Sequence, residues 1–187
     1  MIRQMLLAAG AEVTAGRYPF HHRMKVDVVA AAPQVFGILD NHRRLAAHME
    51  KPSIMMAGAT MHGATDTLNG RSVSSLINVR TLILGVNLAG DEVVTERIPP
   101  LCKICETQGE PRLLVIGSYL MGFTISDRGN RSRLAVFIHY QLPRNGFPRV
   151  FGLIFGGVYA AWCTRRLATD ALSACSDVAI MQLEHHG

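Results

Sequence analysis

The sequence predicts a single-domain α+β fold, in which a run of β-strands is followed by one long C-terminal helix. Its 187 residues are enough to form one domain with a sizeable core. Between residues 53 and 142, short β-rich segments alternate with turn residues. After residue 148 the apolar side chains recur every three to four residues, which is typical of a helix. Strands grouped before a helix favour an α+β architecture.

The composition excludes several classes of protein. Hydrophobic residues make up 49% and charged residues 18% of the chain, which excludes an intrinsically disordered protein. The net charge of +5 comes mainly from scattered arginines. They do not cluster with aromatic residues, so we expect no nucleic-acid partner and at most a weak attraction to anionic surfaces such as membranes. The longest apolar run, Val150–Cys163, is too short for a transmembrane helix, which needs about 20 residues.

The two ends of the chain lie outside the predicted domain. Residues 1–20 lack clear periodicity, and we expect a flexible or helical leader. Glu12 lies where a signal peptide would be cleaved, so a secretory signal is not expected. Residues 21–176 form the single domain, and residues 177–187 form a tail that ends in two histidines and a glycine.

The four cysteines do not form a disulfide framework in a chain of this length. Cys102 and Cys105 form a C-x-x-C pair, but residues three apart in a strand point to opposite faces. No second pair of this kind is present, so the sequence predicts buried thiols, no metal and no cofactor. Reduced cysteines favour a cytoplasmic protein.

The first predicted elements are a strand and two short helices. Apolar and charged side chains alternate in residues 22–30, which indicates a half-buried strand. Pro33 begins a helix that ends at Asp40, because proline is favoured at the first helical position. A second short helix spans residues 43–49 and is stopped by Pro52.

The middle of the chain predicts consecutive strands. They span residues 53–62, 71–83, 84–88, 92–98, 101–107, 112–125 and 132–142. The breaks between them are assigned to residues 63–69, 90–91, 99–100, 109–111 and 127–130. One long helix then spans about residues 149–175.

Several short segments match a known superfamily in the same order. They are Ala32–Phe36 with Leu39–Asp40, Leu45–Met49, Glu96–Pro100 with Lys103 and Glu106–Thr107, Ile116–Phe123 and Tyr159–Cys163. These segments and the element order resemble the SRPBCC superfamily, which includes START lipid-transfer domains, polyketide cyclase/dehydrase-like proteins and the birch-pollen allergen family. The likeness covers about residues 21–170. It implies a helix-grip fold, in which a curved antiparallel sheet wraps around the long C-terminal helix and two short helices follow the first strand. It also implies an apolar ligand cavity between sheet and helix, and no common catalytic set.

Small and adaptable residues are consistent with such a cavity. Glycine inside a helix costs about 1 kcal/mol relative to alanine, so Gly152, Gly156 and Gly157 need a reason. They either leave room for a ligand or let the helix pack closely on the sheet. The nine methionines either adapt to an apolar guest or fill the core. We expect the ligand to contact Tyr119, Met121, Phe123, Tyr140, Arg97, Met61, Phe155, Tyr159 and Trp162.

Polar side chains on the strands have structural as well as functional interpretations. The phenols of Tyr119 and Tyr140 would bind a ligand carbonyl or hydroxyl, or else serve as structural groups. Glu96 and Arg97 are adjacent in a strand, so only one of them points into the cavity. With Glu106, they could equally form ion pairs on the outer face.

No histidine is assigned a catalytic role. His62 and His139 lie in predicted strands, where each is either a general base for cyclisation or dehydration or a structural histidine. His42 and His48 flank the second short helix near the expected pocket mouth. Together with Asp40 they show no metal-ligand spacing.

Three functions are consistent with the sequence. The first is the binding of a hydrophobic or aromatic small molecule, such as a lipid, polyketide or isoprenoid. The second is an enzyme of the cyclase/dehydratase type that acts on a related apolar substrate in the same cavity. It would need a titratable group inside the cavity. The third is a protein-interaction module, which a large exposed apolar patch without a cavity would favour.

Overall fold

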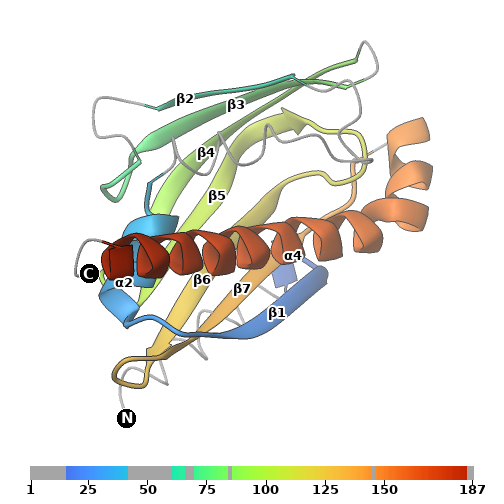
Figure 1. Cartoon of the computed structure of the whole chain (residues 1–187). Coiled ribbons are helices and arrows are strands. Elements are labelled where there is room, and N and C mark those ends of the chain that lie inside the picture. The colour runs from blue at the N-terminus through green and yellow to red at the C-terminus, as the bar shows by residue number, and fades with distance from the viewer. Residues whose placement is uncertain (1–15, 42–59, 66–69, 84–85, 145, 185–187) are drawn as a thin grey trace.

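The structure is a computed structural model of the whole chain, and it describes residues 16–41, 60–65, 70–83, 86–144 and 146–184. It confirms the α+β helix-grip fold, in which a curved antiparallel sheet grips the long helix α4 (Figure 1). The elements are β1 Phe20–Val28, α2 Ala32–Leu39, β2 Thr60–Thr65, β3 Leu76–Ile83, β4 Val86–Ile98, β5 Cys102–Arg112, β6 Tyr119–Asp127, β7 Ser132–Tyr140 and α4 Phe147–Glu184. Among the described residues, no helix is long and apolar enough to cross a membrane.

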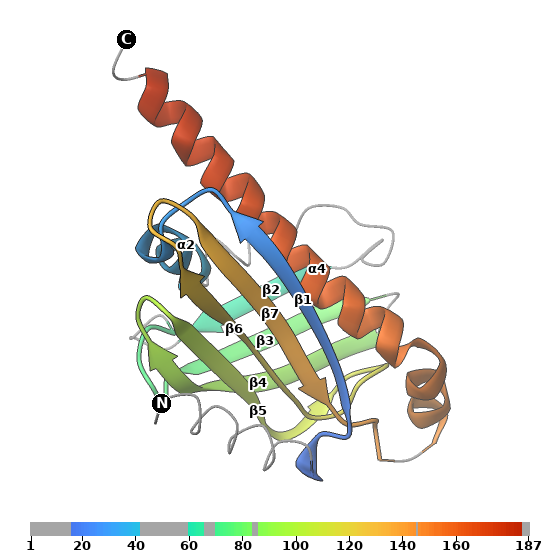
Figure 2. The same ribbon diagram turned by 90° about the horizontal axis from the view of Figure 1, so that it is seen from below.

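The sheet has seven strands in the order β1-β7-β6-β5-β4-β3-β2, and each pair of neighbours is antiparallel. Strands β2 to β7 follow one another as a meander, whereas β1 pairs with β7, the last strand of the sheet in sequence order. Figure 2 shows α4 running behind β1 and β7, with α2 beside the sheet. The helix therefore covers the inner face of the β1 side of the sheet.

The main core lies between α4, α2 and the inner faces of β1, β6 and β7. In β7 the side chains of Leu134, Val136 and Ile138 are buried, because alternate residues of a strand share one face. Short side chains of α4, Ala168 and Ala171 among them, are fully buried against this layer. The helix approaches the sheet closely because these positions carry only methyl groups.

The early part of the chain agrees with the sequence where it is described. The first strand is β1, and Pro33 lies in the first turn of α2 as predicted. The helix expected at residues 43–49 lies outside the described residues, as does most of the strand expected at residues 53–62. Strand β2 continues to Thr65, through part of the predicted loop.

The turn predicted at residues 90–91 is wrong, because β4 runs without interruption through both residues. A register shift against β5 between Ala89 and Asp91 accommodates Gly90 instead. A second shift lies between Val94 and Glu96. This second shift places one extra residue, Thr95, on β4 and changes which of its side chains face the core from there on.

Strand ends around residue 112 were also predicted incorrectly. Strand β5 continues to Arg112, past Gly109, which adopts a positive φ of 66°. The predicted strand 112–125 is shorter, because residues 113–118 form an irregular segment and β6 begins only at Tyr119. The helix α4 is longer than predicted and reaches Glu184, so it includes most of the expected tail.

Helix α4 is bent near its start. Figure 1 shows the first turns, in orange, at an angle to the long red part that crosses the sheet. Gly156 and Gly157 lie in this early part of α4, and adjacent small residues are a common cause of helix bending. The bend carries the first turns of the helix over residues 113–116, where the candidate pocket lies.

Candidate functional site

A pocket of about 230 Å³ lies between the start of α4 and the irregular segment that follows β5. Its wall is almost entirely apolar. The lining residues are Leu88, Leu113, Leu114, Val115, Ile116, Phe151, Phe155, Val158 and Tyr159. Phe155 and Val158 are exposed, whereas Ile116 is buried, so the pocket leads from the molecular surface into the core. Among the lining residues that the structure describes, the phenol of Tyr159 is the one ionisable group.

Two glycines hold the helix against this wall. A Cβ atom on Gly152 would lie 2.6 Å from the carbonyl oxygen of Val115, and one on Gly156 would lie 3.2 Å from the ring of Tyr140. Both glycines therefore allow a close approach of helix to sheet. Gly157 is exposed, and its nearest neighbour would be the Tyr140 hydroxyl at 4.0 Å. Close packing, rather than space for a ligand, is thus the role of Gly152 and Gly156.

A partly buried hydrogen bond joins two strands near the pocket. Tyr119 on β6 donates its hydroxyl hydrogen to the carboxylate of Glu92 on β4. The loss of hydration raises the pKa of Glu92, and it outweighs the opposing effects of the Tyr119 hydrogen bond and the Lys103 charge. The pKa of Tyr119 is raised well above its ordinary value by burial and by the same carboxylate. Glu92 is thus a carboxyl group that holds a proton more tightly than in water.

The helix contributes the neighbouring polar groups. Tyr159 and Cys163 are one helical turn apart on α4, and their side chains are hydrogen-bonded. Cys163 and burial both raise the pKa of Tyr159. Burial raises the pKa of the Cys163 thiol to about 12, so this cysteine is a thiol and not a reactive thiolate. Glu92 acts electrostatically on both residues. Four side chains therefore form one cluster: Glu92, Tyr119, Tyr159 and Cys163.

A second buried polar cluster attaches α2 to the sheet. Asp40, at the C-cap of α2, forms an ion pair of 2.9 Å with Lys103 and one of 2.8 Å with Arg97. Lys103 is only 2% exposed, and the Arg97 guanidinium also lies over the ring of Phe36. Burial alone would raise the pKa of Asp40, but the hydrogen bonds from Arg97 and Lys103 lower it. Both cations are paired with the one carboxylate of Asp40, so this cluster holds α2 against the sheet.

The predicted ligand-binding residues separate into three groups. Phe155 and Tyr159 line the pocket, and Trp162 lies beside Tyr159 with ring centroids 5.9 Å apart. Tyr119 belongs to the polar cluster with Glu92. The rest lie elsewhere: Met121 and Phe123 pack in the core, Tyr140 is buried and stacks on Phe20, and Arg97 binds Asp40. Met61 lies in β2, and its side chain is outside the described residues.

The other polar candidates that the structure describes do not occur among the lining residues of the pocket. Arg97 rather than Glu96 meets the inner residue Lys103 in the register, as expected for neighbours that face opposite ways. Glu106 binds Tyr18 and Arg17. His139 stacks on His21, and burial, then the charges of His21 and Arg23, lower its pKa. The side chains of His42, His48 and His62 lie outside the described residues.

Sequence reasoning missed most of the pocket wall. Residues 113–116 were assigned to a continuous strand, because their composition is strongly β-like. Glu92 was also missed, although a signal was available. It lies two residues before the buried Val94, so both share the inner face of β4.

The described residues contain no group of three or more His, Cys, Asp or Glu side chains that could hold a metal ion. The cysteines of the C-x-x-C pair are both buried and face opposite sides of β5, as predicted. The arrangement therefore offers an apolar pocket whose described lining includes one phenol, that of Tyr159.

Comparison with known proteins supports the fold. No family model matches the chain, and no curated protein is similar to it in sequence. Solved structures that share the architecture include the following three. A protein from Thermus thermophilus superposes with a TM-score of 0.60 at 10% identity, covering 85% of this chain and 99% of its own. Norcoclaurine synthase from Thalictrum flavum superposes with a TM-score of 0.56 at 14% identity, covering 83% of this chain and 85% of its own. The protein Ara h 8.0201 superposes with a TM-score of 0.56 at 8% identity, covering 82% of this chain and 98% of its own. At these identities the likeness shows the helix-grip fold alone.

Proposed function

We propose that this chain binds a hydrophobic or aromatic small molecule in the pocket between α4 and residues 113–116. The observation that supports this proposal is the apolar wall of the pocket, to whose described part Tyr159 contributes the single phenol. Ligand sites are typically concave and apolar, with a few polar groups that fix the orientation of the ligand. Removal of apolar ligand surface from water contributes about 25 cal/mol per Å² before entropic costs.

The size and polarity of the pocket narrow the ligand. A volume of about 230 Å³ fits a small aromatic molecule or one end of a longer chain. Tyr159 favours a ligand with a carbonyl or hydroxyl group at its inner end. Lipids, polyketides and isoprenoids, which the superfamily resemblance implies, include such molecules. A fold neighbour, norcoclaurine synthase from Thalictrum flavum, has been solved with dopamine and hydroxybenzaldehyde, both aromatic.

The test is native mass spectrometry of the purified protein, followed by extraction and identification of any bound molecule. Leu114→Trp fills the pocket and is expected to abolish the additional mass. Ile98→Trp adds the same indole at a partly exposed site outside the pocket, and it should leave the bound mass unchanged. Circular dichroism establishes that both variants fold. Equal ligand retention by two folded variants would contradict the proposed site.

A second candidate function is proton-transfer catalysis of the cyclase or dehydratase type. It is favoured by Glu92, whose raised pKa and contact with Tyr119 suit a group that takes up and releases a proton. Glu92→Gln keeps the shape of the site and removes its proton exchange. An enzyme would lose turnover while retaining the ligand, whereas a carrier would retain both its ligand and its transfer activity.

The same variant tests the protonation of Glu92 without any substrate. Because the folded protein holds this proton more tightly than the unfolded chain, stability from Glu92 falls as pH rises from about 4.3 through the folded pKa. Chemical denaturation across this range should show a smaller fall for Glu92→Gln than for the unchanged protein. Parallel pH profiles for the two proteins would contradict the raised pKa.

The four cysteines support a reducing compartment, and we infer a cytoplasmic protein. Expression with a reporter tag and microscopy or fractionation tests this inference. Recovery of the protein from a secreted fraction would contradict it.

A further inference from the structure

The first turns of α4 expose an unusually apolar surface. It consists of Phe147, Val150, Leu153, Ile154, Phe155 and Val158, which we call the apolar face. Phe147 is 71% exposed, Leu153 62% and Ile154 63%. No charged residue occurs in α4 between Arg149 and Arg165. A contiguous exposed apolar surface on one helix marks a contact with another hydrophobic phase.

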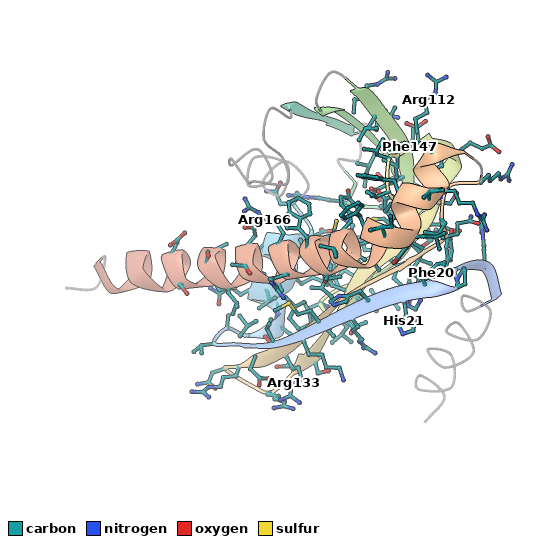
Figure 3. The ribbon with its side chains drawn as sticks, turned by 90° about the vertical axis from the view of Figure 1, so that its right-hand side faces the viewer. Phe20, His21, Arg112, Arg133, Phe147 and Arg166 are labelled. Atoms are coloured by element: carbon teal, nitrogen blue, oxygen red, sulfur yellow. The ribbon has the colours of Figure 1, made fainter. Side chains whose placement is uncertain are left out.

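The charged residues around this face are mainly cationic. Arg149 is exposed on the first turn of α4, and Arg144 precedes the helix. Arg112, at the end of β5, is exposed at the same end of the molecule as Phe147 (Figure 3). The nearby acidic residue Glu110 forms an ion pair with Arg144. The described border of the apolar face therefore carries a positive charge.

The apolar face and the pocket are continuous. Phe155 and Val158 belong to both, because they line the pocket and remain exposed. A hydrophobic molecule that moved between the pocket and an apolar phase in contact with this face would not cross bulk water. The surface is thus placed for exchange with a membrane.

We propose that the apolar face docks on the surface of an anionic lipid bilayer. Apolar side chains on one side of a helix insert at the boundary of headgroups and acyl chains, and flanking arginines bind anionic headgroups. Two copies of the chain meeting through this face would bring their arginine borders together, which favours a lipid surface over a second copy. The proposal goes beyond ligand binding and does not depend on which molecule fills the pocket.

The test is flotation of the full chain with vesicles of phosphatidylcholine alone or mixed with phosphatidylglycerol. We expect binding to the mixed vesicles that weakens as salt concentration rises. Leu153→Asp and Ile154→Asp should each lower the partition coefficient about tenfold or more. Arg149→Glu should lower it about fivefold or more, since each basic residue near the surface contributes modestly. None of these three residues lines the pocket.

Matched variants at other sites are the controls. Val29→Asp adds the same charge at a residue that is 72% exposed, and it should leave vesicle binding unchanged. Arg165→Glu reverses the charge of an exposed arginine on the later part of α4, and it should also leave vesicle binding unchanged. Failure of the unchanged protein to bind mixed vesicles overturns the proposal. So does a dimer, seen by analytical ultracentrifugation, that Leu153→Asp dissociates while vesicle binding is absent. If the unchanged protein binds mixed vesicles but carries no small molecule in native mass spectrometry, that result would contradict the ligand proposal alone.

Discussion

The two parts of α4 contrast sharply, although they belong to one continuous helix. The later part, from Ala160 onward, buries a stripe of small residues against β1, β7 and α2. Its outer side is polar and includes the exposed residues Arg165, Thr169 and Ser173. In the first part this order is reversed. Gly152 and Gly156 are buried, and large apolar side chains face outward.

This difference indicates that the two parts of α4 have different roles, one in stability and the other in binding. The later part follows the usual rule that apolar surface is buried and polar surface faces water. Thr164 adds a hydrogen bond to His22 on β1, with 2.8 Å between Oγ1 and Nδ1. The first part breaks this rule where the pocket opens. Stability is therefore expected to depend mainly on the later part and its supports, and binding on the first part.

The largest effect on stability is expected from the cluster that supports the later part. Asp40→Asn leaves the buried ammonium of Lys103 without its carboxylate, which should lower the free energy of unfolding by about 3–5 kcal/mol. Because α2 packs on α4, the loss should loosen the later part of the helix. Denaturant unfolding measures the change. The matched control is Asp27→Asn, which breaks an exposed pair with Arg133 and should cost at most about 1 kcal/mol.

The carboxyl group of Asp40 also makes the stability of the folded protein depend on pH. The pKa of Asp40 is lower in the folded protein than in the unfolded chain, so its stabilising contribution is complete above about pH 4. The contribution is lost as pH falls from there through the folded pKa. Acid titration of the unfolding free energy should therefore be steeper for the unchanged protein than for Asp40→Asn. Identical slopes would show that Asp40 is not held by its two cationic partners.

Smaller effects on stability are expected from two glycines in the first part of α4. Their signs should be opposite, because one glycine is buried and the other is exposed. Gly152→Ala places a methyl group against the Val115 carbonyl oxygen and should cost about 1–3 kcal/mol. Gly157→Ala meets nothing closer than 4.0 Å and should stabilise the helix by about 1 kcal/mol. Thermal unfolding compares the two variants. Equal destabilisation would mean that this part of α4 lies elsewhere on the sheet.

The smallest effect is expected on the apolar face itself. Leu153→Ser removes a large side chain that is 62% exposed, so the free energy of unfolding should change by no more than about 0.5 kcal/mol. Leu134→Ser in β7, which is fully buried, should be strongly destabilising by comparison. Chemical denaturation of both variants tests the contrast. A large loss of stability in Leu153→Ser would indicate that this side chain packs in the core.

The sequence predicted the fold because its signals are local and repeat along the chain. Alternation in β1 and β7 and the change of period near residue 148 are enough to order the elements. The continuous course of β4 through Gly90 could not be predicted, because pairing with β5 overrides the local turn signal. Strand ends depend on partners that are distant in the sequence.

The candidate site was predictable only in part. Phe155 and Tyr159 were identified because their helical spacing places them on neighbouring turns near the expected cavity. The partner of Arg97 is Asp40, 57 residues earlier, and no local pattern indicates that pairing. Residues 113–116 form a pocket wall because the bent start of α4 lies over them, and a bend leaves no periodic signal.

The position of β1 has a consequence for how the chain folds as it is synthesised. Its residues pair with β7, so Phe20 lies opposite Tyr140 and Val28 opposite Ser132. Strand β1 can therefore pair with β7 only after about a hundred further residues have been translated. Helix α4, which covers both strands, is translated later still. Cooperative folding of this domain is thus a late event, and the meander β2 to β7 is the part that can assemble first.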